Sequence, residues 1–302
     1  MTSSLLTAGA LHSLMAALSW AIAMVLFKRS GDEVPPLALN YFKNTLGLGL
    51  LAVTLVVTGQ PMFPDTPGED VALLIVSGAV GIGLADTLLF HSLNILGAGR
   101  SAIVACLYSP LIMLLSFLLL DESLTAYTGL GAALVIGGVL FTARDSAAVE
   151  VGTEKTVEET VKGVVLGATS VALMGIAIVV VKPVLEVHSV LWATTLRMLG
   201  GAAVLTVFAV GSARSRRQVL RAFVPGPIWK YSVPGSIAGT YVALLFWVSG
   251  FKYTTAITAS ILNQTSTLIV VILATVFLHE KLTRTRVLAV LLGSAGTALT
   301  LL

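Results

Sequence analysis

The sequence predicts an all-α membrane protein with ten transmembrane helices arranged as two inverted five-helix repeats. Apolar residues make up 56% of the 302 residues and charged residues only 11%, and the mean hydropathy is +0.97. So few charges cannot cover the surface of a soluble domain of this length. Ten stretches are apolar over the ~20 residues that a spanning helix needs, and a duplicated turn motif divides the chain into halves.

The ten predicted spans occupy nearly the whole chain and leave little room for a soluble catalytic domain. No Lys or Arg precedes the first span, and Lys28 and Arg29 follow it, so we interpret it as a membrane helix and not as a cleavable signal. Cys106 is the single cysteine, which excludes an intrachain disulfide. The spans lie at roughly residues 8–27, 37–58, 71–93, 101–120, 125–143, 161–181, 189–210, 228–250, 255–278 and 284–302.

The duplication is visible in two turn motifs that each precede an apolar, Gly-rich run. Residues 121–125 read DESLT and residues 279–283 read HEKLT. A repeat of this length in so hydrophobic a chain indicates that a membrane domain was duplicated. We therefore predict a first repeat at 1–143, a linker at 144–160 and a second repeat at 161–302.

An odd number of spans in each half places the two repeats in opposite orientations. Assigning the loops to alternate sides puts nearly all Lys and Arg on the side away from the termini, and only Lys182 and Lys252 on the other. Because basic residues stay cytoplasmic, this distribution predicts that both termini are outside.

Three features together resemble the drug/metabolite transporter superfamily, specifically its ten-span members with two EamA-type domains. They are the basic residues Lys43 and Arg197 early in the second span of each repeat, Pro110 within the fourth span, and the duplicated Glu-x-Leu-Thr turn. The resemblance covers almost the entire chain and implies a secondary transporter, often an exporter of amino acids or other metabolites, with a central cavity between the halves. It also implies cytoplasmic termini, against the charge distribution. Leu268 stands where the first repeat has Pro110, so the second repeat lacks the proline that would kink it.

The charged residues inside the spans are the first candidates for a substrate site. Asp86 lies past the middle of the third span, where insertion of a charge costs ~2.5–3.5 kcal/mol, and Phe90 shares its helix face. Lys43 and Arg197 occupy matched positions and would suit a substrate carboxylate or phosphate. The alternatives are that both basic side chains extend to the membrane interface, or that Arg197 is the permanent partner of Asp86.

Polar and aromatic residues in mid-span supply the other candidates. Pro110 removes a backbone hydrogen bond beside Tyr108 and Ser109, and freed carbonyls are tolerated only next to protein or cavity water. Polar groups on the ninth span exceed what inter-helix hydrogen bonding requires, so we expect them to line a cavity. The remaining candidates are Asn263, Gln264 and Thr267 on the ninth span, Asn40 and Asn44 on the second, and the aromatic residues Trp20 and Trp247.

The sequence favours a transporter over the other classes. The four histidines fall near span ends without ligand spacing, and no Gly-rich phosphate loop is present, so we expect no enzyme, metal or cofactor. Basic residues form no nucleic-acid patch, and a receptor or scaffold has little use for an inverted duplication.

We predict a multi-pass protein of the cell or inner membrane that moves small metabolites, amino-acid-like ones first, by alternating access at a midplane cavity. Protons or a counter-substrate are the candidate coupling partners. The alternative is a drug or organic-cation/proton antiporter. Membrane lipids are the other expected partners, and a monomer is compatible with the sequence.

Overall fold

The computed structural model describes residues 3–61, 64–120, 156–280 and 283–299, together with a few positions between 126 and 137. These residues are helical and contain no strand, which confirms the all-α class. Eight helical segments are long and apolar enough to cross a membrane, and a further apolar helix, α15 (Arg284–Leu299), is shorter. Most of the predicted fifth span at 125–143 lies outside the described residues.

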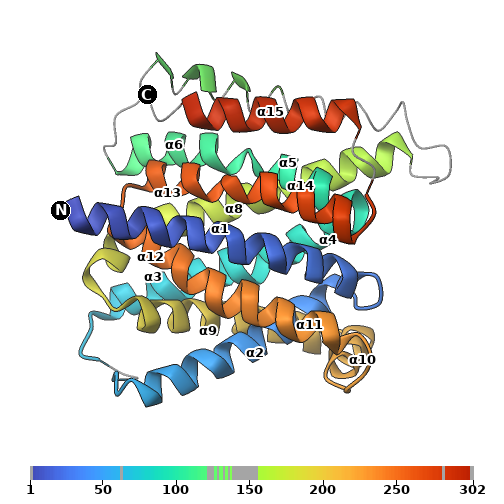
Figure 1. The fold of residues 1–302 in the computed structure, drawn as a ribbon. Helices are drawn as coiled ribbons and strands as arrows, with labels where there is room; N and C mark the ends of the chain where they lie inside the picture. Colours follow the sequence, from blue (N-terminus) through green and yellow to red (C-terminus); the bar gives the residue numbers. More distant parts are fainter. Residues whose placement is uncertain are drawn as a thin grey trace.

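The spans lie side by side as nearly antiparallel rods, and several of them are divided into two or three helices (Figure 1). The first half contains α1 (Ser3–Gly31), α2 (Pro36–Val57), α3 (Gly68–Gly78), η1 (Ala79–Ala85), α4 (Asp86–Leu96), α5 (Ala98–Ala105) and α6 (Tyr108–Leu119). The second half contains α8 (Val157–Val187), α9 (Val190–Val210), α10 (Ala213–Ala222), α11 (Trp229–Ser236), η2 (Ile237–Ala243), α12 (Leu244–Tyr253), α13 (Ala256–Asn263), α14 (Thr265–Phe277) and α15.

Local sequence signals explain where several helices begin and end. Pro36 occupies the first turn of α2, where its missing amide proton costs nothing. Thr156 and Glu159 form a capping box at the start of α8, each backbone amide donating to the other's side chain at 3.2 Å. Gly97 has a φ of 80°, a left-handed conformation that favours glycine, and it separates α4 from α5.

The two halves interlock and do not form separate bundles. α1 packs on α12 and α14 of the second half, α4 packs on α8, and α9 packs between α2 and α3 (Figure 1). α3 and α9 approach so closely that a methyl group on Gly78 would overlap the carbonyl of Arg197, and one on Gly200 would overlap the carbonyl of Ile75. Small residues permit such backbone approach between membrane helices, and here they fix the helix that carries Arg197.

The duplication is also visible in the helix boundaries. Both third spans contain a π-helix, η1 at 79–85 and η2 at 237–243, and the short helices α5 (98–105) and α13 (256–263) also match. Each pair is offset by 158 residues, the same spacing that separates the two turn motifs. π-Helices are rare and occur frequently at functional sites, so their repetition marks the third spans for attention.

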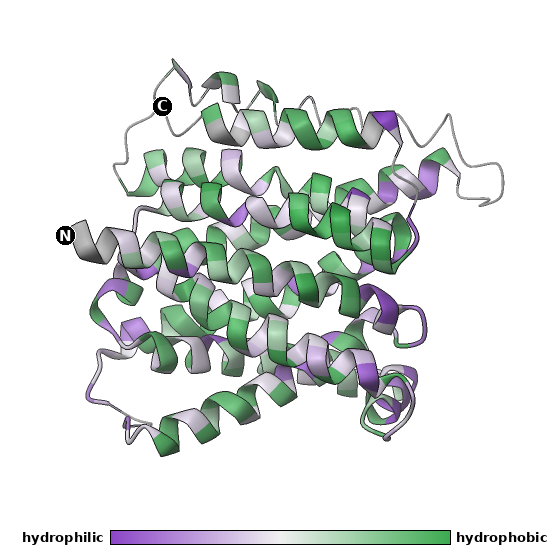
Figure 2. Cartoon of the chain, in the orientation of Figure 1, coloured by the Kyte–Doolittle hydropathy of each residue, from purple (hydrophilic) through white to green (hydrophobic). Residues whose placement is uncertain are grey.

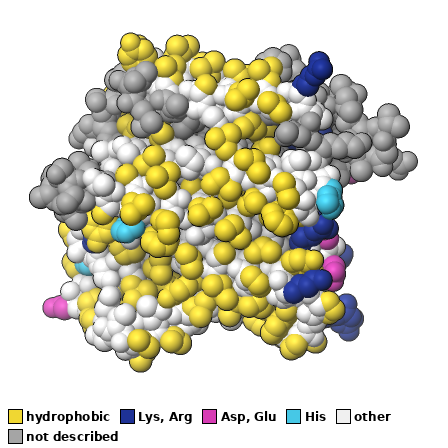
Figure 3. Space-filling model, in the orientation of Figure 1, with side chains coloured by type: hydrophobic (Ala, Val, Ile, Leu, Met, Phe, Trp, Pro, Cys, Tyr) yellow, Lys and Arg dark blue, Asp and Glu magenta, His cyan; other side chains and the backbone are white. Residues whose placement is uncertain are grey.

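The surface has the pattern of a membrane protein. Long apolar stretches cover the middle of the rods, and the hydrophilic residues gather toward their ends (Figure 2). In the same orientation, Lys and Arg side chains cluster at one end of the molecule, over the end of α1, α10 and the start of α15, whereas the N-terminus lies at the opposite end (Figure 3). This separation agrees with the loop charges of the sequence.

Candidate functional site

The site begins where a span of the first half is interrupted in mid-membrane. α5 ends at Ala105 and α6 begins at Tyr108, and the amide of Leu107 donates to the carbonyl of Val104 at 3.1 Å, which tightens the turn. Pro110 sits in the first turn of α6, so the interruption expected beside it is present.

The corresponding span of the second half breaks as well, although it has no proline. α13 ends at Asn263 and α14 begins at Thr265. The hydroxyl of Thr265 donates to the carbonyl of Leu262 at 2.8 Å, and the amide of Gln264 donates to the carbonyl of Ile261 at 3.0 Å. A backbone hydrogen bond and the hydroxyl of Thr265 thus satisfy carbonyls at this turn. The break is present in the second half although Leu268 replaces the proline.

The two interruptions are tied to each other. The side-chain amide of Gln264 donates to the carbonyls of Cys106 at 2.8 Å and Ala105 at 3.3 Å, and the hydroxyl of Thr267 donates to the carbonyl of Ala102 at 3.3 Å. Because lipid cannot accept or donate hydrogen bonds, freed carbonyls at this depth need such partners. Gln264 and Thr267 therefore hold the broken spans together as well as facing the cavity.

A cavity of about 140 Å³ lies against these breaks. This volume is below the roughly 300–1,000 Å³ of drug-sized sites. Its walls come from both halves and combine a largely apolar surface with a few polar groups. Nine of the residues predicted from the sequence line it: Trp20, Lys43, Asp86, Tyr108, Arg197, Trp247, Asn263, Gln264 and Thr267.

Asp86 is paired with Lys43 and not with Arg197. The ammonium of Lys43 lies 2.6 Å from Oδ2 of Asp86, and the two residues are only 2% and 6% exposed. Nζ of Lys43 also lies 5.6 Å from the ring centroid of Phe90. A buried ion pair of this kind is costly to break, because removal of one partner leaves an unpaired charge in a medium of low dielectric constant.

Arg197 has a different environment, although it occupies the matched position of the second half. It is 1% exposed, and among the described residues none accepts a hydrogen bond from its Nε or Nη1. Its guanidinium lies 5.4 Å from the ring centroid of Trp247, in a cation–π contact. Gly81 of η1 leaves space beside Nη2, which would lie 3.5 Å from an added Cβ. Arg197 is therefore a cavity cation that an anionic group could still pair with.

The helix offset explains why only one cation is neutralised. Asp86 is the first residue after η1, and Leu244 is the first residue after η2. Leu244 also lines the cavity, so an apolar side chain stands where the second half would need an acid. Among the described lining residues the charged groups are Lys43, Asp86 and Arg197, which leaves one positive charge in excess.

Four predicted site residues lie behind the cavity wall and not on it. The amide of Asn40 donates to the carbonyls of Ile82 and Gly83, both at 3.1 Å, and thereby satisfies the π-helix η1. The amide of Asn44 donates to Oδ1 of Asn40 at 2.7 Å. These residues were predicted at the site because they are polar and in mid-span. Asn44 also donates to the carbonyl of Asn40 at 2.9 Å, and its buried Oδ1 has no hydrogen-bond partner among the described residues.

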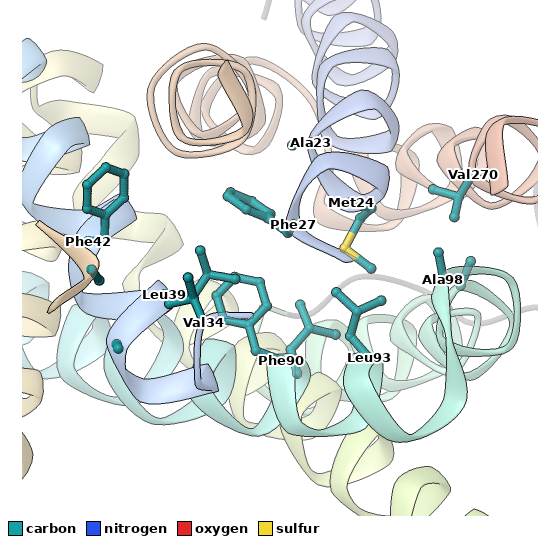
Figure 4. Close-up of a cluster of buried hydrophobic side chains, with 14 of the residues drawn as sticks. Ala23, Met24, Phe27, Val34, Leu39, Phe42, Phe90, Leu93, Ala98 and Val270 are labelled. Atoms are coloured by element: carbon teal, nitrogen blue, oxygen red, sulfur yellow. The ribbon is translucent and has the colours of Figure 1, made fainter. Parts of the chain in front are cut away.

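Phe90 and Ser109 also lie in packing contacts. Phe90 belongs to an apolar cluster with Phe27 and Leu93 (Figure 4), and its ring centroid is 5.2 Å from that of Phe27. The hydroxyl of Ser109 is 3.5 Å from that of Ser260, at the crossing of the two broken spans. Phe90 shares a helix face with Asp86, as predicted, and this position brings its ring near Lys43. Phe90 does not line the cavity.

Other lining residues were not anticipated from the sequence. Applying the repeat offset of 158 residues to Asp86 would have identified Leu244 as its counterpart. The same offset relates the small residues of the two π-helices. Methionines and other apolar lining residues could not be predicted, because the sequence does not distinguish them from the apolar residues that face lipid on every membrane helix. The main unanticipated residues are Met24, Gly81, Leu89, Ser170, Met174, Gly239, Thr240 and Leu244.

Glu280 caps a helix that belongs to the other half of the chain. Its carboxylate accepts hydrogen bonds from the amides of Ala98 at 2.7 Å and Gly99 at 3.1 Å, at the start of α5. The turn of the second half thus anchors a broken span of the first. The matching Glu122 lies outside the described residues.

Within the described part of the chain, no group of three or more His, Cys, Asp or Glu residues could hold a metal ion. The architecture is that of a multi-pass membrane protein with a cavity between two repeats, largely apolar and lined by a few polar groups. Residues 7–144 and 161–302 both match the EamA-like transporter family, so the chain belongs to this family of the drug/metabolite transporter superfamily. It is an integral membrane protein and a transporter of small molecules.

A solved structure described as a crystal structure of a protein has the same fold. It superimposes with a TM-score of 0.71 at 20% sequence identity, over 97% of this chain and 96% of that one. No curated protein matches the chain.

Proposed function

We propose that this protein is a secondary transporter of amino-acid-like metabolites that works by alternating access at the central cavity. The observation that carries this proposal is the buried guanidinium of Arg197, which forms no salt bridge among the described residues, because Asp86, the acidic residue of the cavity lining, is bound to Lys43. A carboxylate can accept two parallel hydrogen bonds from a guanidinium and removes the penalty of its burial. We therefore assign the substrate carboxylate to Arg197.

The rest of the lining suits the remainder of an amino-acid-like molecule. The amide oxygens of Asn263 and Gln264 offer acceptors for an amino group. Trp20, Trp247 and Met174 provide apolar surface for a side chain.

For the architecture we propose ten spans in two inverted five-helix repeats, at 1–143 and 161–302 with a linker at 144–160. The nine described apolar helices, the family match to both halves and the matched π-helices support this arrangement. Two opposed halves around one site give two related states, which alternating access needs.

Protons are the coupling ion that we favour, and Asp86 is their binding group. Protonation of Asp86 would remove the partner of Lys43 and free its ammonium to face the cavity. That change would couple the charge of the pair to occupancy of the site.

The alternative function is a drug or organic-cation/proton antiporter. The aromatic lining would suit a lipophilic cation, but the excess positive charge of the cavity opposes one. A non-transporting receptor or scaffold would move nothing under any gradient.

Counterflow into proteoliposomes tests these functions together. We expect labelled amino acids to enter vesicles loaded with the same unlabelled compound, and Arg197→Gln to abolish this exchange. Uptake of lipophilic cations that survives Arg197→Gln would instead establish the antiporter. No flux of either kind would refute the transport proposal.

A further inference from the structure

A short arginine-rich helix at one end of the bundle lies outside the proposed transport site. α10 (Ala213–Ala222) connects span α9 to span α11, and its four arginines are all exposed. In Figure 1 it is seen nearly along its own axis, whereas the spans lie across the page. α10 therefore runs across the ends of the spans, which is the orientation of an interfacial helix.

Side-chain contacts hold α10 in a defined position against the bundle. Val219 and Ala222 are buried in the cluster that includes Phe42, and the ring centroids of Phe223 and Phe42 are 5.1 Å apart. The indole of Trp229 donates to the carbonyl of Ala222 at 3.1 Å. These contacts fix which face of the helix is turned away from the protein.

The outward face combines cations with apolar side chains. Arg214, Arg217 and Arg221 follow at spacings of three and four residues and share one face. Leu220 and Val224, each 63% exposed, lie beside them. None of the ion pairs among the described residues involves an arginine of α10. A hydrophilic partner would leave the two apolar side chains in water, whereas a lipid headgroup region accepts both kinds.

The position of α10 along the chain places it at the depth of the headgroups. α9 ends at Val210, which is 61% exposed and belongs to a lipid-facing apolar stretch, and α10 starts three residues later. Basic residues of other elements gather at the same end of the molecule (Figure 3). Clusters of arginine on an amphipathic helix next to a span bind anionic lipids.

We propose that α10 is a binding site for anionic phospholipid, with Arg214, Arg217 and Arg221 contacting the phosphates and Leu220 and Val224 entering the acyl boundary. The site anchors the end of the bundle to the negatively charged leaflet. It is independent of the substrate cavity, so it can fail without affecting the transport proposal, and the reverse also holds.

The test uses the purified full chain in uncharged detergent, titrated with phosphatidylglycerol or phosphatidylcholine while thermal unfolding is followed. We expect phosphatidylglycerol to raise the unfolding midpoint at far lower concentration than phosphatidylcholine. The double variant Arg214→Gln, Arg217→Gln should need at least about tenfold more phosphatidylglycerol for the half-maximal shift. The matched control Lys162→Gln, Arg284→Gln removes two exposed cations of other elements, including one at the same end of the molecule, and should behave as the parent if α10 itself is the site.

Three results would overturn the proposal: a parental response in the α10 variant, equal shifts with both lipids, or the same shift with inorganic phosphate or a short DNA duplex. If the α10 variant does not fold, a dye on Val224→Cys in a Cys106→Ala background replaces it. Its emission should shift further to the blue in nanodiscs of phosphatidylglycerol than in those of phosphatidylcholine. Identical spectra would contradict the assignment.

Discussion

The matched basic residues of the two repeats have different partners. In the first half Lys43 is neutralised by Asp86, whereas in the second half Leu244 occupies the position that matches Asp86, and both Leu244 and Arg197 line the cavity. The comparison suggests that duplication produced two similar cation positions and that divergence at one residue after each π-helix separated their roles. One cation is part of a buried pair, and the other is available to a substrate.

The largest effect is expected where the available cation is removed. Arg197→Gln keeps a polar side chain but loses the charge, so a bound carboxylate loses a charge-assisted interaction of about 2–3 kcal/mol, roughly 30- to 150-fold in affinity. Counterflow of amino acids in proteoliposomes measures the loss. Arg197→Lys is the control and should retain part of the activity as a point charge without bidentate geometry.

Supplying the missing acid should give the next largest effect. Leu244→Asp would give Arg197 a permanent partner and lower amino-acid binding by about tenfold or more, because the substrate carboxylate would have to displace an internal one. Leu244→Asn has nearly the same shape without the charge. Binding that falls equally in both variants would attribute the effect to lost packing and not to charge.

The pair of the first half should respond most strongly in stability. Asp86→Asn leaves Lys43 buried without a counter-charge and should cost about 3–5 kcal/mol in the free energy of unfolding. The double variant Lys43→Met, Asp86→Leu removes both charges and should unfold near the parental temperature. Thermal unfolding of the purified proteins measures the difference. A double variant as unstable as Asp86→Asn would show that the two side chains stabilise the fold through contacts other than their mutual charge pairing.

The same double variant tests proton coupling. We expect it to exchange substrate across vesicles, yet to lose uptake driven by a pH gradient. Proton-driven uptake that persists would assign coupling to another group.

The smallest effect is expected at the aromatic partner of Arg197. Trp247→Leu removes the cation–π contact and should weaken substrate binding by about 0.5–2 kcal/mol, because the guanidinium would be less well oriented. Isothermal titration with the best substrate measures this change. Trp20→Leu, on the first half of the cavity, is the matched control and should leave the orientation of Arg197 intact.

The helical architecture and the charged residues inside the spans could be predicted from the sequence. The length of the apolar stretches predicted the helical class, because the bilayer imposes that length and a helical backbone on spanning segments. The repeated turn contributed to the prediction of the family. Asp86, Lys43 and Arg197 were found because a buried charge in a membrane span needs a reason to persist. All three line the cavity.

The sequence could not say which charges pair. Asp86 is 43 residues from Lys43 and far more from Arg197, and only the packing of α2 against α4 makes Lys43 the partner. The sequence also could not say that the side chain of Asn40 donates to the carbonyls of Ile82 and Gly83, since a buried polar side chain serves backbone carbonyls as readily as a ligand. Met24 and Met174 give no signal at all in a chain where apolar residues cover every helix face.

The most direct test of the account compares each standard amino acid with the amine that lacks its carboxylate. Ligand-induced thermal shifts of the parent protein and of Arg197→Gln should be recorded for each pair of compounds. We predict that some amino acids stabilise the parent, that their amines do not, and that Arg197→Gln loses the response to the acids. Amines that bind the parent as well as the amino acids do, with responses unchanged in Arg197→Gln, would contradict the assignment of the substrate carboxylate to Arg197.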